Sequence, residues 1–109
     1  MILTTTETVP GRAIESALGL VKGNTVRAAH AGDDMQAWFK NLVGGELEEY
    51  TALLAGAREQ ALDRLIADAR ARGADAVVGL HFSSCEIAEG AAEFLVYGTA
   101  VKLLPQKPV

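Results

Sequence analysis

The chain has 109 residues, of which 50% are apolar and only 6% aromatic, and its formal net charge is −4. This length is enough for one domain with one core over residues 1–109. A domain of this size is too small to hold an enclosed cofactor crevice as well. The negative charge and the scattered Lys and Arg residues exclude a basic nucleic-acid surface. One cysteine excludes an internal disulfide framework, and no apolar run approaches the roughly 20 residues needed to span a bilayer. We therefore expect a cytoplasmic protein that binds neither nucleic acid nor membrane.

The first part of the chain predicts two strands separated by a turn and a short helix. Ile2–Thr6 is short and β-branched, and Pro10-Gly11 is typical of a turn. Arg12–Leu18 carries apolar residues at helical spacing and predicts two turns of helix that end at Gly19. Leu20–Ala29 follows as a strand.

The middle of the chain has the apolar period of a helix. Asp33 and Asp34 occupy an N-cap position before an amphipathic helix that ends at Gly44-Gly45. A longer helix is predicted over Glu46–Arg72, about 40 Å at 1.5 Å per residue. Such a helix is longer than a domain of this size needs, so one end is expected to pack on a neighbouring subunit. Its apolar stripe consists of Leu47, Tyr50, Leu54, Ala57, Ala61, Leu65 and Ala69.

After Gly73, which ends the long helix, the chain predicts a strand over Ala76–Ser84. This run is almost continuously apolar, which is typical of a strand covered on both faces. One helix covers only one face, so we expect the face that carries Val77 to lie against another subunit. The sequence therefore predicts a homo-oligomer.

The last strand is predicted over Ala92–Leu104, with Glu89-Gly90 at the tip of a hairpin. A two-residue loop would place Glu86 opposite Glu93, and like charges directly opposite one another destabilise a sheet. We therefore expect a longer loop with a bulge at Gly90.

Cys85 and His81 are the candidate metal ligands. A thiolate and an imidazole suit zinc or copper, and they also suit a nucleophile with its base. A regular strand places both side chains on one face, together with Val77, but four residues along a strand cover about 13 Å. Zinc–ligand bonds are near 2 Å, so another subunit must complete any site. A small buried thiol and an interface histidine are the alternative interpretation.

Other groups of side chains have two interpretations each. His30, Asp33 and Asp34 could form a loose divalent-ion site, or the acids could simply cap a helix. Aromatic residues could stack a planar ligand such as a flavin, or they could belong to the core or to a subunit contact. These aromatic residues are Trp38, Phe39, Tyr50 and Tyr97. The glutamates Glu46, Glu48 and Glu49 do not face one another on a helix and so form no catalytic pair.

Short blocks in a fixed order run almost the whole length of the chain. They are Thr4-Thr5-Thr6, Pro10-Gly11, Gly19-Leu20-Val21-Lys22-Gly23, Gly44-Gly45-Glu46-Leu47, Tyr50-Thr51, Ala57-Arg58, Ala61, Gly73-Ala74-Asp75-Ala76-Val77-Val78 and Tyr97-Gly98-Thr99-Ala100-Val101. This ordered set resembles the YbjQ-like family, which is described as heavy-metal-binding. The resemblance implies an α+β fold similar to the dodecin subunit, with one long helix on a small, mainly antiparallel sheet. It also implies a ring, either a pentamer or a stack of two pentamers. The chain departs from the family at His81, where many relatives carry Arg, so a ligand role does not transfer to that position.

Three functions follow as hypotheses, in this order. The first is a homo-oligomeric binding or scaffold protein that holds a soft metal or metalloid ion between subunits, and the second is a carrier of a flavin-like molecule in an interface pocket. The third is a thiol-dependent enzyme. The acidic neighbours Glu86 and Glu89 disfavour a thiolate at Cys85, and the chain lacks the common phosphate-binding, nucleophile and metal motifs. We therefore expect no enzyme.

Overall fold

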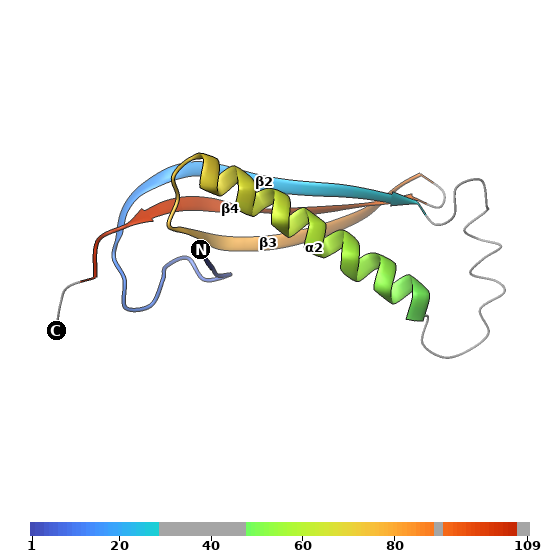
Figure 1. Cartoon of the computed structure of the whole chain (residues 1–109), viewed down its shortest axis with the longest axis horizontal. Coiled ribbons are helices and arrows are strands. Elements are labelled where there is room, and N and C mark those ends of the chain that lie inside the picture. Colours follow the sequence, from blue (N-terminus) through green and yellow to red (C-terminus); the bar gives the residue numbers. More distant parts are fainter. Residues whose placement is uncertain (29–47, 89–90, 107–109) are drawn as a thin grey trace.

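The computed structural model describes residues 1–28, 48–88 and 91–106. Its elements in chain order are β1 (Ile2–Leu3), β2 (Ile14–Ala28), α2 (Glu48–Ala71), β3 (Ala76–Ala88) and β4 (Ala91–Leu103). The strands form a sheet in the order β1-β3-β4-β2, in which β1 runs parallel to β3 and the other neighbours are antiparallel. Helix α2 lies along one face of this sheet (Figure 1). The fold is therefore α+β, with one long helix on a mainly antiparallel sheet, as the sequence predicts.

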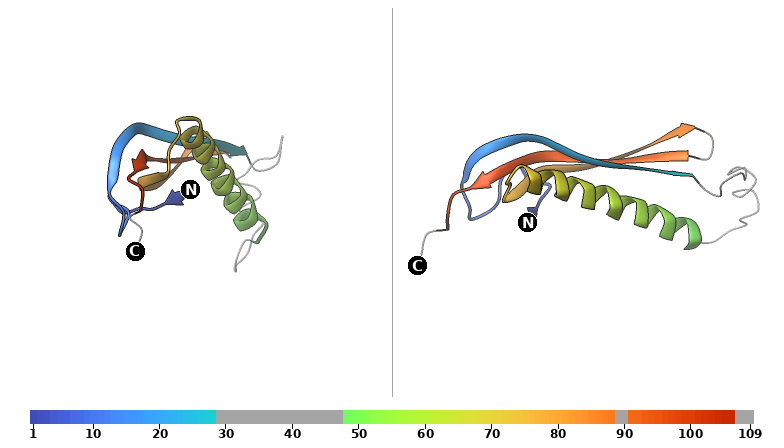
Figure 2. Two further views of the ribbon diagram at one scale, coloured as in Figure 1. Left: turned by 60° about the vertical axis from the view of Figure 1, so that its left-hand side comes forward. Right: turned by 45° about the horizontal axis from the view of Figure 1, so that its top comes forward.

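The helix packs on β2 through small side chains. Ala57, Ala61, Leu65 and Ala69 recur every four residues along α2 and are fully buried, so they form one face of the helix. A Cβ atom at Gly23 of β2 would lie 2.1 Å from the carbonyl oxygen of Ala61 and 2.5 Å from the backbone nitrogen of Leu65. Helix and strand backbones are thus in direct contact here, and Figure 2 shows the C-terminal part of α2 next to β2, while the start of the helix lies away from the sheet.

The first half of β3 is covered on both faces by the chain itself. Val77 and Leu80 pack under α2, in a core with Leu65. On the other face, Val9 of the N-terminal segment covers Val78, in a second cluster with further residues of β3 and β4. The prediction that Val77 faces away from the helix is wrong. The inference that a second subunit must cover the other face of this part of β3 also fails, because residues 1–14 supply that cover.

The predicted helix over Arg12–Leu18 is wrong, since Ile14 begins the long strand β2. Ile14 and Leu18 are four residues apart, and this spacing puts two side chains on one face of a strand as well as of a helix. Gly19 has a φ of 100° and lies at an irregularity in the pairing of β2 with β4. It marks a bulge in a strand and not the end of a helix.

The β3–β4 hairpin keeps Glu86 and Glu93 apart by a bulge within β3. The two strands extend to Ala88 and Ala91, so the longer loop predicted from the sequence is wrong. The bulge predicted at Gly90 lies outside the described residues, whereas the register shifts between Glu86 and Ala88, within β3. Because of this bulge, Glu86 pairs with Ala92 and not with Glu93, and like charges are kept apart.

The far half of β3 is exposed, while its neighbour β4 keeps Phe94 and Val96 buried. We call residues 81–88 of β3 together with residues 91–97 of β4 the hairpin half. Every residue of β3 from His81 to Ala88 is exposed. Phe82 and Ile87 each keep 52% of their surface accessible, and Val26 on the neighbouring part of β2 keeps 49%. A strand of 13 residues is about 43 Å long at 3.3 Å per residue, so the sheet extends well past the core that this chain builds.

Candidate functional site

The strand register assigns the candidate residues to one face of the sheet. Directly opposed residues of antiparallel strands point to the same face, and Thr25 of β2, which donates a hydrogen bond to the carbonyl of Ala57 in α2, identifies the helix side. We call the opposite side the outer face. In the hairpin half and the adjacent part of β2, its residues are His81, Ser83, Cys85, Glu93, Leu95, Tyr97, Lys22, Asn24 and Val26.

The sequence predicts that Val77, His81 and Cys85 lie on one face of the sheet. This prediction is wrong for Val77. The pairing of β3 with β4 shifts between Val78 and His81, and Gly79 has a φ of 61°. This bulge inserts an extra residue and reverses the alternation of side chains along the strand. Val77 therefore points to the helix, while His81 and Cys85 point to the outer face.

Cys85 lies opposite an acidic residue that the sequence did not single out. Its partner across the hairpin is Glu93, so the Cβ atoms of the two are about 4.5–5.5 Å apart. The amide nitrogen of Asn24 donates a hydrogen bond of 3.4 Å to the Glu93 carboxylate. The thiol is exposed. The sequence indicates this pair only when the hairpin register is known, and that register depends on the position of the bulge at the end of β3.

His81 has an aromatic neighbour instead of a metal ligand. It lies opposite Tyr97, and the two ring centroids are 5.6 Å apart with the planes tilted by 39°. The stretch from His81 to Cys85 pairs regularly with β4, so the two residues are about 13 Å apart along the strand. They cannot bind one ion within a single chain.

A structural metal site needs about four converging ligands. Within residues 1–28, 48–88 and 91–106, no group of three or more His, Cys, Asp or Glu side chains lies close enough to hold a metal ion. Cys85 and Glu93 supply a thiolate and a carboxylate, which is half of such a set. The described residues of one chain therefore do not fit a metal ion, and any site needs ligands from elsewhere.

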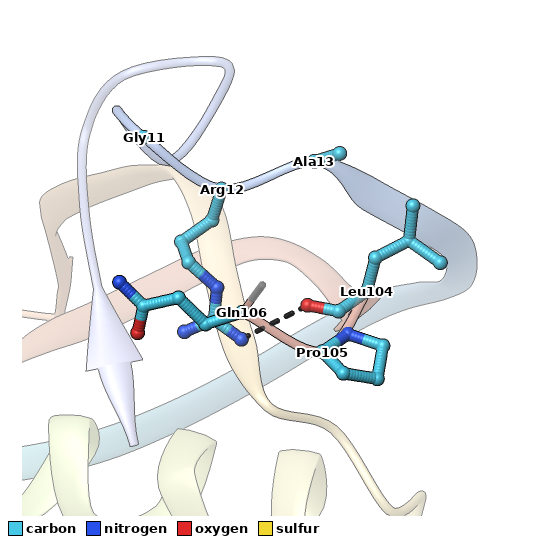
Figure 3. A pocket seen from close by; sticks show the side chains of 6 residues that line it. All are labelled: Gly11, Arg12, Ala13, Leu104, Pro105 and Gln106. Carbon is cyan, nitrogen blue, oxygen red and sulfur yellow. Dashed lines mark hydrogen bonds between the residues drawn. The ribbon is translucent and has the colours of Figure 1, made fainter. Parts of the chain in front are cut away.

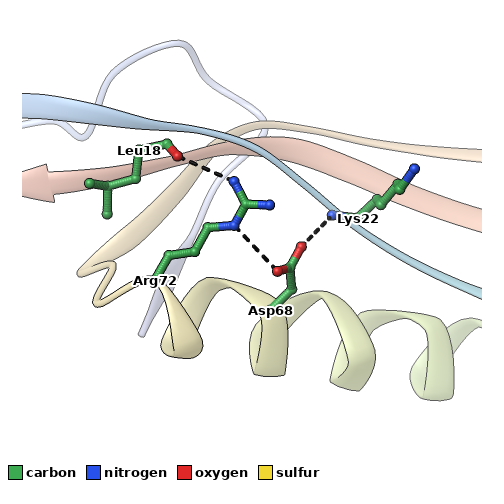
Figure 4. A network of polar contacts seen from close by, with 4 residues as sticks. All are labelled: Leu18, Lys22, Asp68 and Arg72. Atoms are coloured by element: carbon green, nitrogen blue, oxygen red, sulfur yellow. Dashed lines mark hydrogen bonds and ion pairs between the residues drawn. The ribbon is translucent and has the colours of Figure 1, made fainter.

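A polar network joins α2 to the free edge of β2 (Figure 4). Asp68 forms an i,i+4 ion pair with Arg72 at 3.3 Å and also accepts a hydrogen bond of 3.4 Å from the backbone nitrogen of Lys22. Arg72 donates to the carbonyl of Leu18 at 3.3 Å, and Arg64 donates to the carbonyl of Asn24 at 2.6 Å. Helix side chains thus bind backbone groups of an edge strand, which is a structural role.

A shallow concavity lies at the opposite end of the sheet, where the N-terminal turn meets the end of β4 (Figure 3). Arg12 donates a hydrogen bond of 3.1 Å to the carbonyl of Leu104, and its Nε is buried without a partner among the described residues. Nearby, Asp75 accepts a hydrogen bond of 2.9 Å from the backbone nitrogen of Leu103 and pairs with Lys102 at 3.6 Å. The hydrogen bond from Leu103 is the main cause of the lowered pKa of Asp75, and Lys102 contributes. These contacts join the start of β3 to the end of β4.

Several candidates from the sequence lie outside the described residues. They are His30, Asp33, Asp34, Trp38, Phe39 and Glu46. Glu48, Glu49 and Tyr50 lie in the first turn of α2, where only the backbone is described. In the described parts of the chain, no helix is both long and apolar enough to cross a membrane.

Comparison with known proteins identifies the family. The model of the YbjQ family, described as "Putative heavy-metal-binding", matches residues 1–104. The chain belongs to this family. A UPF0145 protein of Methanoculleus marisnigri is 59% identical over 107 residues, which cover 98% of this chain and 100% of the relative. A UPF0145 protein of Archaeoglobus fulgidus is 56% identical over 103 residues, which cover 94% and 95% of the two chains.

A solved structure supports the fold alone. It is the crystal structure of a protein of unknown function from the DUF74 family of Pediococcus pentosaceus, with a TM-score of 0.60 and 18% sequence identity. The match covers 95% of this chain and 98% of that one. The arrangement of one helix on a small sheet is thus shared with that protein over nearly the whole length of both chains.

Proposed function

We propose that this YbjQ-family protein is a cytoplasmic homo-oligomer, a cyclic pentamer or two stacked pentamers, that binds a soft metal or metalloid ion between subunits. The observation that carries the proposal is the exposed Cys85 thiol directly opposite the Glu93 carboxylate. Thiolates favour soft and borderline ions such as zinc, cadmium and copper(I). The proposed role is binding and not catalysis.

Assembly is part of this proposal because the ligand set in one chain is incomplete. Closed symmetry repeats each surface residue around an axis, so a thiol and a carboxylate from each subunit become a full set where two or more subunits meet. The exposed apolar residues of the hairpin half support assembly independently, since Phe82 and Ile87 each keep 52% of their surface accessible. Apolar side chains gathered on an exposed part of a sheet are typical of an interaction surface.

Calorimetry with cadmium ions tests the metal proposal. The wild-type oligomer should bind fewer than one ion per chain, because several subunits share each ion. Cys85→Ser should weaken binding by at least about tenfold and leave the oligomer mass unchanged, whereas the control Ser83→Ala, on the same face, should bind as the wild type does. Equal affinity in the Cys85→Ser variant, or one tight site per chain in a dissociated protein, would contradict the proposal.

A flavin-like carrier is the second candidate, and the exposed His81–Tyr97 ring pair supports it. Two tilted rings on an open strand surface offer one aromatic face on which a planar ligand can stack. Fluorescence titration with riboflavin tests this function. Quenching by the wild type that disappears in Tyr97→Ala would favour the carrier, while absence of quenching in the assembled protein would exclude it.

A further inference from the structure

The two edges of the sheet differ in how their backbone groups are used. On the β2 edge, outward backbone groups of Leu18 and Lys22 are bound by the side chains of Arg72 and Asp68 of α2 (Figure 4). The carbonyl of Asn24 likewise accepts a hydrogen bond from Arg64 of α2. An edge covered by a helix is a poor template for another strand. This edge is therefore protected along much of its length.

The β3 edge is closed only in its first half. The backbone nitrogens of Gly79 and Leu80 donate to the carbonyls of Thr6 and Thr4 at 2.8 Å and 3.0 Å. Backbone groups of an antiparallel edge strand point outward at every second residue. Since the backbone N–H of Leu80 points outward from the edge, the N–H and C=O groups of Phe82, Ser84 and Glu86 do so too. Among the described residues, no backbone group pairs with them.

This open stretch carries no Lys or Pro, and its charged residue, Glu86, lies at its end next to the bulge. Natural edge strands carry Lys, Pro or a covering element, whereas residues 82–86 read Phe-Ser-Ser-Cys-Glu. Phe82, which points to the helix side next to the open edge, is 52% exposed. The stretch is long enough for a five-residue ladder, and its bulge at residue 87 marks the end.

We propose that the β3 edge of one subunit pairs antiparallel with the β3 edge of a second copy, about a two-fold axis at Ser84. A second copy is the fitting occupant because each copy presents the same open groups, so the contact is self-complementary. The β2 edge of the second copy is a weaker alternative, because α2 already binds its backbone groups. The proposal rests on the self-assembly proposed above and specifies one contact within it; a ring of five joined in this way becomes two stacked rings.

The register follows from using every free backbone group. With Ser84 opposite Ser84 of the partner subunit, Phe82 lies opposite Glu86 of the partner subunit, and all three outward residues pair on both chains. Centring on Ser83 would place Glu86 opposite Leu80, whose N–H is already bound to Thr4. Centring on Cys85 would leave Phe82 without an outward partner. The Ser84 register also avoids opposing two glutamates.

Proline variants at the two edges test the contact. Ser84→Pro removes an outward N–H and no bond of the chain's own ladder, which an edge strand tolerates. Val26→Pro is the matched control, because Val26 occupies an outward position on the β2 edge. Light scattering should show that Ser84→Pro halves the oligomer mass while Val26→Pro retains it. The reverse pattern, or an unchanged mass in Ser84→Pro, would overturn the proposal.

Disulfide trapping determines the register of the contact without a proline substitution. In the Ser84 register, residue 83 of one chain lies opposite Cys85 of the partner subunit in a non-hydrogen-bonded pair, with Cα atoms about 4.5 Å apart, within the range of a disulfide. With diamide as oxidant, Ser83→Cys should therefore form covalent dimers. Wild type should not, and neither should Ser83→Cys combined with Cys85→Ser. Dimers of wild type would indicate the Cys85 register, and dimers of the double variant the Ser83 register; either result overturns the Ser84 register.

These outcomes separate this inference from the proposed function. A monomeric wild type would contradict both the proposed function and the β3 contact. An oligomeric wild type that binds cadmium, but whose mass is unaffected by Ser84→Pro and which forms no dimers with Ser83→Cys, would remove only the β3 contact.

Discussion

Replacing Gly23 with alanine tests the contact between β2 and α2 most directly. The added methyl carbon would lie 2.1 Å from the carbonyl oxygen of Ala61 and 2.5 Å from the backbone nitrogen of Leu65. Both atoms belong to the helix backbone, so no side-chain rotation relieves the overlap, and the helix must move away from the strand. Overpacking of a core costs about 1–3 kcal/mol, and we expect the upper end, because movement of α2 also disturbs its buried alanine stripe.

Guanidinium denaturation followed by circular dichroism, at one fixed protein concentration, measures this loss. Gly56→Ala is the matched control, since Gly56 is exposed in α2 and nothing lies within 4 Å of its added Cβ. Alanine in the interior of a helix is favoured over glycine by roughly 0.5–1 kcal/mol, so this variant should be more stable than the wild type. The same chemical change therefore gives opposite signs at the two sites. A Gly23→Ala protein with wild-type stability would show that α2 does not lie against β2 at this point.

Two further predictions concern stability. Leu65 is fully buried between α2 and the sheet, so Leu65→Ala should lower the free energy of unfolding by about 2–5 kcal/mol; a negligible loss in the same denaturation experiment would contradict the assigned core. The folded-state pKa of Asp75 lies below its ordinary value of 3.8, mainly because the backbone nitrogen of Leu103 donates to its carboxylate. A lowered pKa stabilises the fold above pH 3.8 and ceases to do so as the pH falls through the folded value. Asp75→Asn should therefore be less stable than the wild type at neutral pH, and the gap should narrow in urea titrations below pH 3.8; a gap that is constant with pH would refute this.

The sequence predicted the elements whose pattern is long and periodic. The helix predicted over Glu46–Arg72 is observed as Glu48–Ala71, and the last strand predicted over Ala92–Leu104 is observed as Ala91–Leu103. Both have apolar residues at a spacing that only one kind of element satisfies over many turns or pleats. The i,i+4 pair of Asp68 and Arg72 followed directly from the helix assignment.

The errors arose where one spacing suits two structures or where a bulge shifts the alternation. Ile14 and Leu18 fit a helix and a strand equally, and the pairing of β2 with β4 decides for the strand. Gly79 bulges β3, so Val77 turns to the helix and away from the face of His81 and Cys85. Gly79 lies within the predicted strand, but the register shift itself is visible only in the pairing with β4. At Gly98 of β4 a Cβ would lie 2.7 Å from a side-chain carbon of Val77, so the two strands approach closely beside the bulge.

The candidate site was predictable in its residue types but not in its pairing. Cys85 stands out in the sequence because it is the only thiol, whereas Glu93 becomes its neighbour only through the register of the hairpin. The bulge that keeps Glu86 away from Glu93 also brings Glu93 opposite Cys85. One extra residue in β3 thus removes a repulsion between two carboxylates and places a carboxylate beside the thiol.

Cover within the chain ends where the proposed contacts begin. The N-terminal segment closes the outer face over Val78 and the β3 edge up to Leu80. From His81 onward β3 is exposed on both faces, and no backbone group of the described residues pairs with its outer edge. The residues of β3 from His81 onward add exposed apolar surface and no buried side chain, whereas Phe94 and Val96 of the neighbouring β4 stay buried. The hairpin half carries both the Cys85–Glu93 pair and the open backbone groups of β3, and the subunit contacts proposed above would cover these exposed residues.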